Sequence, residues 1–128
     1  MAAYLLDTSV IIDTLNGKRG RKDLLEELVR AGNTLGCCAI NVAEVYAGMR
    51  PHEVEATESL LKSLDYYDIE WQIACKAGEI KFENARRGRN LSLSDTLIAS
   101  VALSHRLTLI TDNVKDYPIV GLEIFSLP

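Results

Sequence analysis

The fold that this sequence predicts is decided by residues 4–12, which read YLLDTSVII. A short apolar run over residues 4–6 stops abruptly at Asp7, and such a run is typical of a buried strand. Thr8 and Ser9 can then cap a short helix that we expect to end near Gly17. The stretch therefore predicts the first strand and helix of an α/β unit, with a carboxylate at their junction.

The rest of the chain continues this alternation of strand and helix patterns. Further strands are predicted at 34–40, 67–69, 107–111 and 122–127, and further helices at 21–31, 42–49, 53–64, 71–87 and 94–105. Asn41 is expected to cap the helix that follows it. We expect one α/β domain over residues 1–128, because no linker or repeat interrupts the pattern. Its central, mostly parallel sheet of four to five strands would be flanked by helices on both faces.

Composition and charge exclude several classes of protein. The 128 residues are 48% apolar and carry a net charge of −4, unlike a basic protein that binds nucleic acid by neutralising phosphates. Any contact with nucleic acid would then use local basic patches or bound metal. The three cysteines lack metal-ligand spacing, so we expect reduced thiols. Without a signal-peptide pattern or a membrane-length apolar run, we expect a cytoplasmic location.

Four carboxylates are predicted to converge at one edge of the sheet. Asp7 and Asp112 each follow a strand directly, and ligands of open α/β sheets bind at the carboxyl ends of the strands. Glu44 lies in the first turn of the helix after the second strand, and Asp95 lies at the start of a later helix. Because like charges repel, such a cluster is costly without a cation. Mg²⁺ takes oxygen ligands and can assist phosphodiester hydrolysis without a side-chain nucleophile.

Each acid also has a purely structural explanation. Residues 92–95 (SLSD) fit a capping box in which Asp95 bonds back to the first amide. Asp7 could cap the first helix, and Asp112 with Asn113 could form an Asx turn. We favour the metal site because it explains all four positions together.

Four motifs stand in order along the chain. They are YLLDTSVII at 4–12, NVAEVYAG at 41–48, LSDTLIA at 93–99 and LITDNVKDY at 109–117. With these motifs the chain resembles, over essentially its whole length, the PIN-domain ribonucleases, and most closely the VapC-type toxins of type II toxin–antitoxin pairs. The resemblance implies a PIN-like nuclease domain.

The resemblance also implies roles for individual residues. The catalytic acids, which would bind Mg²⁺ or Mn²⁺, would be Asp7, Glu44, Asp95 and Asp112. In the fourth motif Asp112, Asn113 and Asp116 compete for one role, and we rank Asp112 first because it lies nearest the strand end. The hydroxyl residues that would orient carboxylates or waters are Thr8, Ser9 and Thr111.

An activity and partners follow from the same resemblance. Family members hydrolyse RNA endonucleolytically, often structured RNA such as tRNA, and so inhibit translation. They usually form homodimers, and a VapB-like antitoxin inhibits them by offering an arginine to the acidic groove. An RNA-processing PIN nuclease outside such a pair, or an inactive PIN-like binding module, remains an alternative. A phosphatase of the aspartyl-phosphate type is disfavoured, because it needs a second Asp where this chain has Ser9.

Two basic clusters are candidate RNA contacts, because arginine suits phosphate recognition. They are Lys18, Arg19, Arg21 and Lys22 after the first helix, and Arg86, Arg87 and Arg89 before the third motif. Solvated loop charges explain both clusters equally well.

Overall fold

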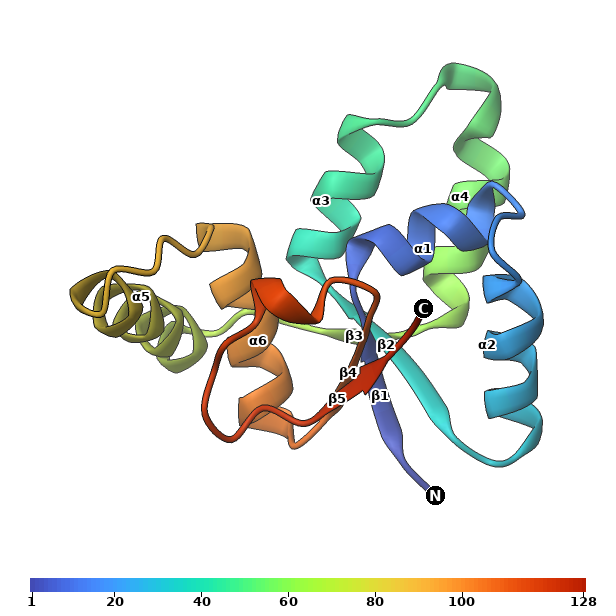
Figure 1. Ribbon diagram of the computed structural model, residues 1–128. Helices are drawn as coiled ribbons and strands as arrows, with labels where there is room; N and C mark the ends of the chain where they lie inside the picture. Colours follow the sequence, from blue (N-terminus) through green and yellow to red (C-terminus); the bar gives the residue numbers. More distant parts are fainter.

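Five short parallel strands form one sheet in the computed structural model, in the order β3-β2-β1-β4-β5 (Figure 1). The structure describes residues 1–128. The strands are β1 (Ala3–Leu6), β2 (Thr34–Cys38), β3 (Asp65–Tyr67), β4 (Thr108–Thr111) and β5 (Ile124–Ser126). The predicted α/β class with a parallel sheet is therefore confirmed.

The strand order contains one switch point, between β1 and β4. From β1 the chain adds β2 and then β3 on one side, whereas β4 and β5 lie on the other side. Because all strands are parallel, their carboxyl ends share one edge, and the crevice for ligands opens where the order reverses. Asp7 and Asp112 follow the two strands that flank this point.

Helices cover both faces of the sheet (Figure 1). They are α1 (Thr8–Leu15), α2 (Arg21–Arg30), α3 (Ala39–Ala47), α4 (Val54–Ser63), α5 (Trp71–Arg86) and α6 (Leu93–His105), with 3-10 turns η1 (Pro51–Glu53) and η2 (Val114–Asp116). Leu6 and Ile110 pack with residues of α1, α2 and α4, whereas Leu5 and Leu109 pack with residues of α5 and α6. Alternate strand residues thus fill two hydrophobic layers. None of these helices combines the length and apolar character that crossing a membrane requires.

The start of α3 differs from the sequence prediction. Cys38 is the N-cap residue, and the helix begins at Ala39, so Asn41 lies inside the first turn. The fully buried Asn41 side chain accepts a hydrogen bond from the Cys38 amide at 2.8 Å and donates to the Leu6 carbonyl at 3.1 Å and the Thr8 hydroxyl at 3.0 Å. The prediction that Asn41 is the N-cap of α3 was wrong, because Cys38 occupies that position. The side-chain amide of Asn41 instead connects the start of α3 to the backbone of β1.

Replacing Asn41 by alanine is expected to destabilise the protein by about 2–4 kcal/mol, because it leaves the Cys38 amide and the Leu6 carbonyl buried without a partner. Urea unfolding followed by circular dichroism measures the change. Asn16→Ala, at the exposed end of α1, is the matched control and should cost much less. Equal losses in the two variants would contradict this role for Asn41.

Candidate active site

The carboxylate of Asp7 lies buried at the end of β1, with 7% of the residue exposed. Its Oδ1 accepts from the Thr8 amide and from the Tyr117 hydroxyl, both at 2.9 Å. Its Oδ2 accepts from the Thr111 hydroxyl at 2.7 Å. Asp7 therefore caps α1, as was expected from its place before the first helix. It is also held by hydrogen bonds from β4 and from the segment after η2.

Tyr117 joins Asp7 to Asp95. Its hydroxyl lies 3.2 Å from Oδ1 of Asp95 as well as 2.9 Å from Oδ1 of Asp7, so the sum of these distances bounds the separation of the two carboxylate oxygens. Tyr117 was not among the site residues expected from the sequence. The available signal was an aromatic residue directly after the last acid of the fourth motif.

The surroundings of Asp95 disfavour its charged form. Burial raises the pKa of Asp95 above its ordinary value, and the negative charges of Asp7 and Asp116 add to this effect. Hydrogen bonds with Ser92 and with Tyr117 partly offset the rise in the pKa of Asp95. Ser92 caps α6 by accepting from the Asp95 amide at 3.1 Å, which is one half of the predicted capping box.

Glu44 is exposed in the first turns of α3 and is linked to the cluster through Thr8. The Thr8 hydroxyl donates to Oε1 of Glu44 at 2.6 Å and accepts from the buried amide of Asn41 at 3.0 Å. Thr8 thus orients Glu44 while its backbone amide holds Asp7.

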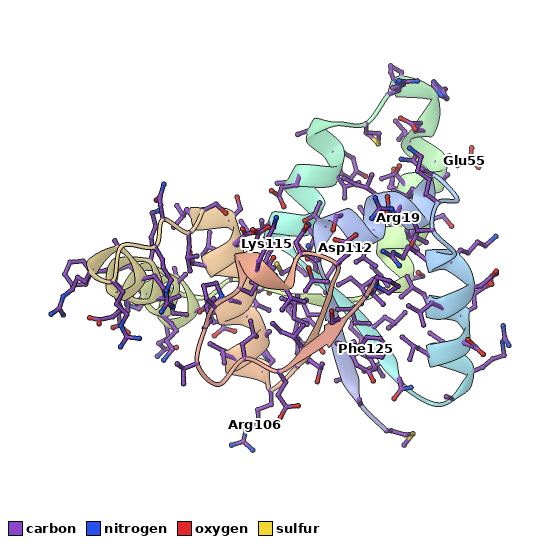
Figure 2. All side chains as sticks on the ribbon, in the orientation of Figure 1. Arg19, Glu55, Arg106, Asp112, Lys115 and Phe125 are labelled. Carbon is purple, nitrogen blue, oxygen red and sulfur yellow. The ribbon has the colours of Figure 1, made fainter.

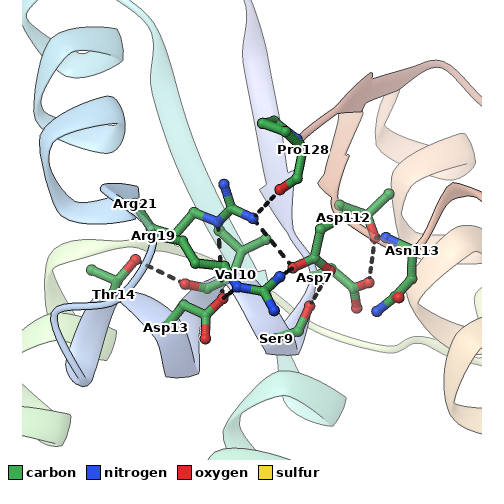
Figure 3. A network of polar contacts seen from close by, with 11 residues as sticks. Asp7, Ser9, Val10, Asp13, Thr14, Arg19, Arg21, Asp112, Asn113 and Pro128 are labelled. Carbon is green, nitrogen blue, oxygen red and sulfur yellow. Dashed lines mark hydrogen bonds and ion pairs between the residues drawn. The ribbon is translucent and has the colours of Figure 1, made fainter.

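Asp112 is held mainly by arginines (Figure 3). Its Oδ2 lies 3.4 Å from Nη2 of Arg21 and 3.5 Å from Nη1 of Arg19, and its Oδ1 accepts from the Ser9 hydroxyl at 3.0 Å. Arg21 is only 3% exposed and also donates to the Pro128 carbonyl at 2.8 Å. The expected fourth acid therefore lies in a charge-neutralised network.

Asp116 and Asn113 differ from Asp112 in their surroundings. Both are exposed on the segment after β4. Asp116 lies close enough to Asp95 for its charge to raise the pKa of Asp95. The backbone amide of Asn113 donates a hydrogen bond to the Thr111 hydroxyl at 2.9 Å. Asn113 thereby orients Thr111, whose hydroxyl donates to Asp7.

The basic clusters divide into residues near the site and residues away from it. Figure 2 shows Arg19 beside Asp112, at the opposite end of the sheet from Arg106. Arg21 is buried, whereas Lys18 and Lys22 are exposed. In the other cluster Arg86 pairs with Glu83 at 3.3 Å, Arg89 donates to the Pro118 carbonyl at 3.3 Å, and Arg87 is exposed.

The acidic side chains offer oxygen ligands, which hard divalent cations prefer. No three carboxylate, imidazole or thiol groups in residues 1–128 are placed to hold one ion together. Mg²⁺ commonly binds one or two carboxylates and keeps several water ligands. Asp7 and Asp95 can supply these two carboxylates. The side chains therefore fit an ion bound by this pair and water, and do not fit a cage of four acids.

Known proteins share the fold and most of the length of this chain. The family model described as PIN domain matches residues 4–115. Ribonuclease VapC10 of Mycobacterium tuberculosis is 31% identical over 115 residues, covering 90% of this chain and 86% of the relative. The tRNA(fMet)-specific endonuclease VapC of Shigella flexneri is 25% identical over 126 residues, 94% of each chain. The structure of VapBC2 from Rickettsia felis bound to a promoter DNA fragment is similar, with a TM-score of 0.85, 25% identity and coverage of 98% of this chain and 99% of that one.

Replacing Asp95 by asparagine is expected to stabilise the metal-free protein at neutral pH. Folding raises the pKa of Asp95, so its charged form is destabilising above that pKa, whereas both states are protonated well below the ordinary value. Asp95→Asn should therefore raise Tm in EDTA at about pH 8 and lose this advantage near pH 3. Calorimetry measures Tm at both pH values, and Asp68→Asn, in an exposed loop, is the control. An unchanged or lower Tm of Asp95→Asn at pH 8 would contradict the burial argument.

Proposed function

This chain belongs to the PIN-domain family, and we propose that it is a metal-dependent endoribonuclease that acts as the toxin of a toxin–antitoxin pair. The observation that carries the proposal is the Asp7–Tyr117–Asp95 cluster at the switch point of the sheet. The names of the relatives, which are ribonucleases and a tRNA endonuclease, support the same activity.

Asp7 and Asp95 are the residues that we assign to cation binding, because their carboxylates share one partner and keep unfilled acceptor positions. When bound, Mg²⁺ or Mn²⁺ would neutralise charge on the phosphodiester and make a water more acidic. The water oxygen would attack phosphorus as the bond from phosphorus to the leaving nucleotide oxygen breaks, and the leaving oxygen would take up a proton from solvent. We assign to Glu44, oriented by Thr8, the acceptance of a proton from this water.

The contacts support Asp116 over Asp112 as the fourth acid. Two arginines already neutralise Asp112, whereas Asp116 is exposed and its charge acts on Asp95. We therefore propose that Asp116 helps bind the cation through a water molecule. Asp112 would instead anchor the loop that carries Arg19.

RNA is the proposed substrate, with structured RNA such as tRNA as the first class to test. One relative is named for a tRNA substrate. A chain of net charge −4 needs local cations to approach phosphates, and exposed Lys18 and Arg19 lie on the loop next to Asp112. Arg89 donates a hydrogen bond to the Pro118 carbonyl, so it lies next to the segment that carries Tyr117. We propose that it contacts phosphates of an RNA bound at the site.

A VapB-like antitoxin is the proposed protein partner. Solved structures similar to this chain are complexes of toxin and antitoxin. The buried Asp7 and the half-buried Asp95 together attract a basic side chain, which would compete with the cation. We propose that the toxin is a homodimer and acts in the cytoplasm, where RNA substrate and antitoxin are met.

An RNA-processing enzyme outside a toxin–antitoxin pair is the second candidate. It needs the same acids but no inhibitor, so an antitoxin gene beside the gene of this chain would exclude it. An inactive PIN-like module is disfavoured because the acids of all four motifs are present.

The purified protein, freed of any inhibitor, is expected to cleave RNA with Mg²⁺ or Mn²⁺ and to stop in EDTA. Asp7→Asn and Asp95→Asn should each lower the rate roughly 1,000-fold or more, because loss of a cation contact removes several kcal/mol of stabilisation. Gel analysis of cleaved tRNA measures the rate, and Asp68→Asn serves as the folded control. Cleavage that persists in EDTA would refute the metal-dependent mechanism.

Separate substitutions of the two candidate fourth acids should have different effects. Asp116→Asn is expected to lower the cleavage rate about tenfold or more with little change in stability. Asp112→Asn should cost about 3 kcal/mol, because it leaves the buried Arg21 with less compensation, and should affect the cleavage rate less. Parallel rate assays and urea unfolding decide between the two, and the reverse pattern would restore Asp112 as the fourth acid.

A further inference from the structure

We propose that Tyr117 is a positioning residue of the nuclease site, whose hydroxyl holds the carboxylates of Asp7 and Asp95 in the orientation that cation binding requires. The proposal rests on the nuclease function proposed above. Its basis is the position of one hydroxyl within hydrogen-bond distance of both carboxylates, at 2.9 Å and 3.2 Å.

The hydrogen bonds of Asp7 show what the hydroxyl does. A carboxylate oxygen offers about two acceptor positions. Oδ1 of Asp7 takes two donors, the Thr8 amide and Tyr117, whereas Oδ2 takes only the Thr111 hydroxyl. Tyr117 therefore occupies the last position on Oδ1 and leaves a position on Oδ2 open. The same hydroxyl lies 3.2 Å from Oδ1 of Asp95, and because it carries a single proton it shares that proton between the two carboxylates.

The hydroxyl acts as a donor to these carboxylates. Burial raises the pKa of Tyr117 far above its ordinary value, and the charges of Asp7 and Asp95 raise it further. Both causes favour the neutral phenol, which can donate a hydrogen bond to a carboxylate oxygen and so orient it.

The ring of Tyr117 is fixed by packing. It is 3% exposed and packs in the core layer that contains Leu5, Ile98 and Leu109. The position of the hydroxyl is thus set by the same layer that fixes β1, β4 and α6. Phenylalanine would keep this packing and remove only the oxygen.

Tyr117→Phe is tested against Tyr4→Phe, which removes a hydroxyl from a ring that packs edge-on against Phe125, with centroids 5.7 Å apart. Calorimetric titration with Mn²⁺ alone, without RNA, is expected to show an affinity lowered about 10–100-fold in Tyr117→Phe and unchanged in the control. The kcat for RNA at saturating Mn²⁺ should fall by a similar factor, while KM for RNA changes less than about twofold.

The outcomes separate the two proposals. If the wild-type protein shows no metal-dependent cleavage, the nuclease function fails, and the Mn²⁺ titration still decides the role of Tyr117. If the wild-type protein cleaves RNA and Tyr117→Phe matches it in Mn²⁺ affinity and kcat, the positioning role is overturned. Should Tyr117→Phe fail to fold, it is combined with Asp95→Asn. Recovery of folding would support a role through the carboxylates, and failure in both backgrounds would overturn the positioning role between Asp7 and Asp95.

Discussion

The buried carboxylate of Asp7 is the constraint on which the rest of the site depends. A charge at this depth is tolerated only when its oxygens are hydrogen bonded. The three donors come from the start of α1, the end of β4 and the segment after η2. Asp7 is therefore satisfied only when these segments have assembled around the central strand. One of the three donors, Tyr117, also lies within hydrogen-bond distance of Asp95 and so connects the start of α6 to the same point.

A second charged network stabilises the neighbouring side of the same crevice. Arg21 is buried at the start of α2 and pairs with Asp112 from the end of β4, with Asp13 of α1 3.9 Å from its Nε. Buried pairs of this kind add little net stability, but breaking one partner is costly. Asp112 therefore has a structural function that its motif alone did not reveal. The result is one acid cluster that is open to a cation beside another that is already neutralised.

Local sequence patterns predicted the parallel sheet and the order of its elements, because hydrophobic periodicity and strand ends are local signals. They also placed Asp7, Glu44 and Asp95 at the carboxyl edge. They could not predict that Arg21 pairs with Asp112 or that Tyr117 contacts Asp7, because these partners are 91 and 110 residues apart. The cap of α3 was misplaced for the same reason, since Asn41 bonds Leu6 across 35 residues.

The contact between Asp7 and Tyr117 has a consequence for synthesis on the ribosome. Chains emerge from the amino terminus, and early segments can fold first. The first acid is made 110 residues before the hydroxyl that satisfies it, and β4 and β5 are also made late. The nascent chain thus lacks a complete acid pair until Asp95 has been made, and lacks its shared donor until Tyr117 has been made. A ribosome that makes this nuclease is therefore not exposed to the finished site while the first three strands and the first five helices are being made.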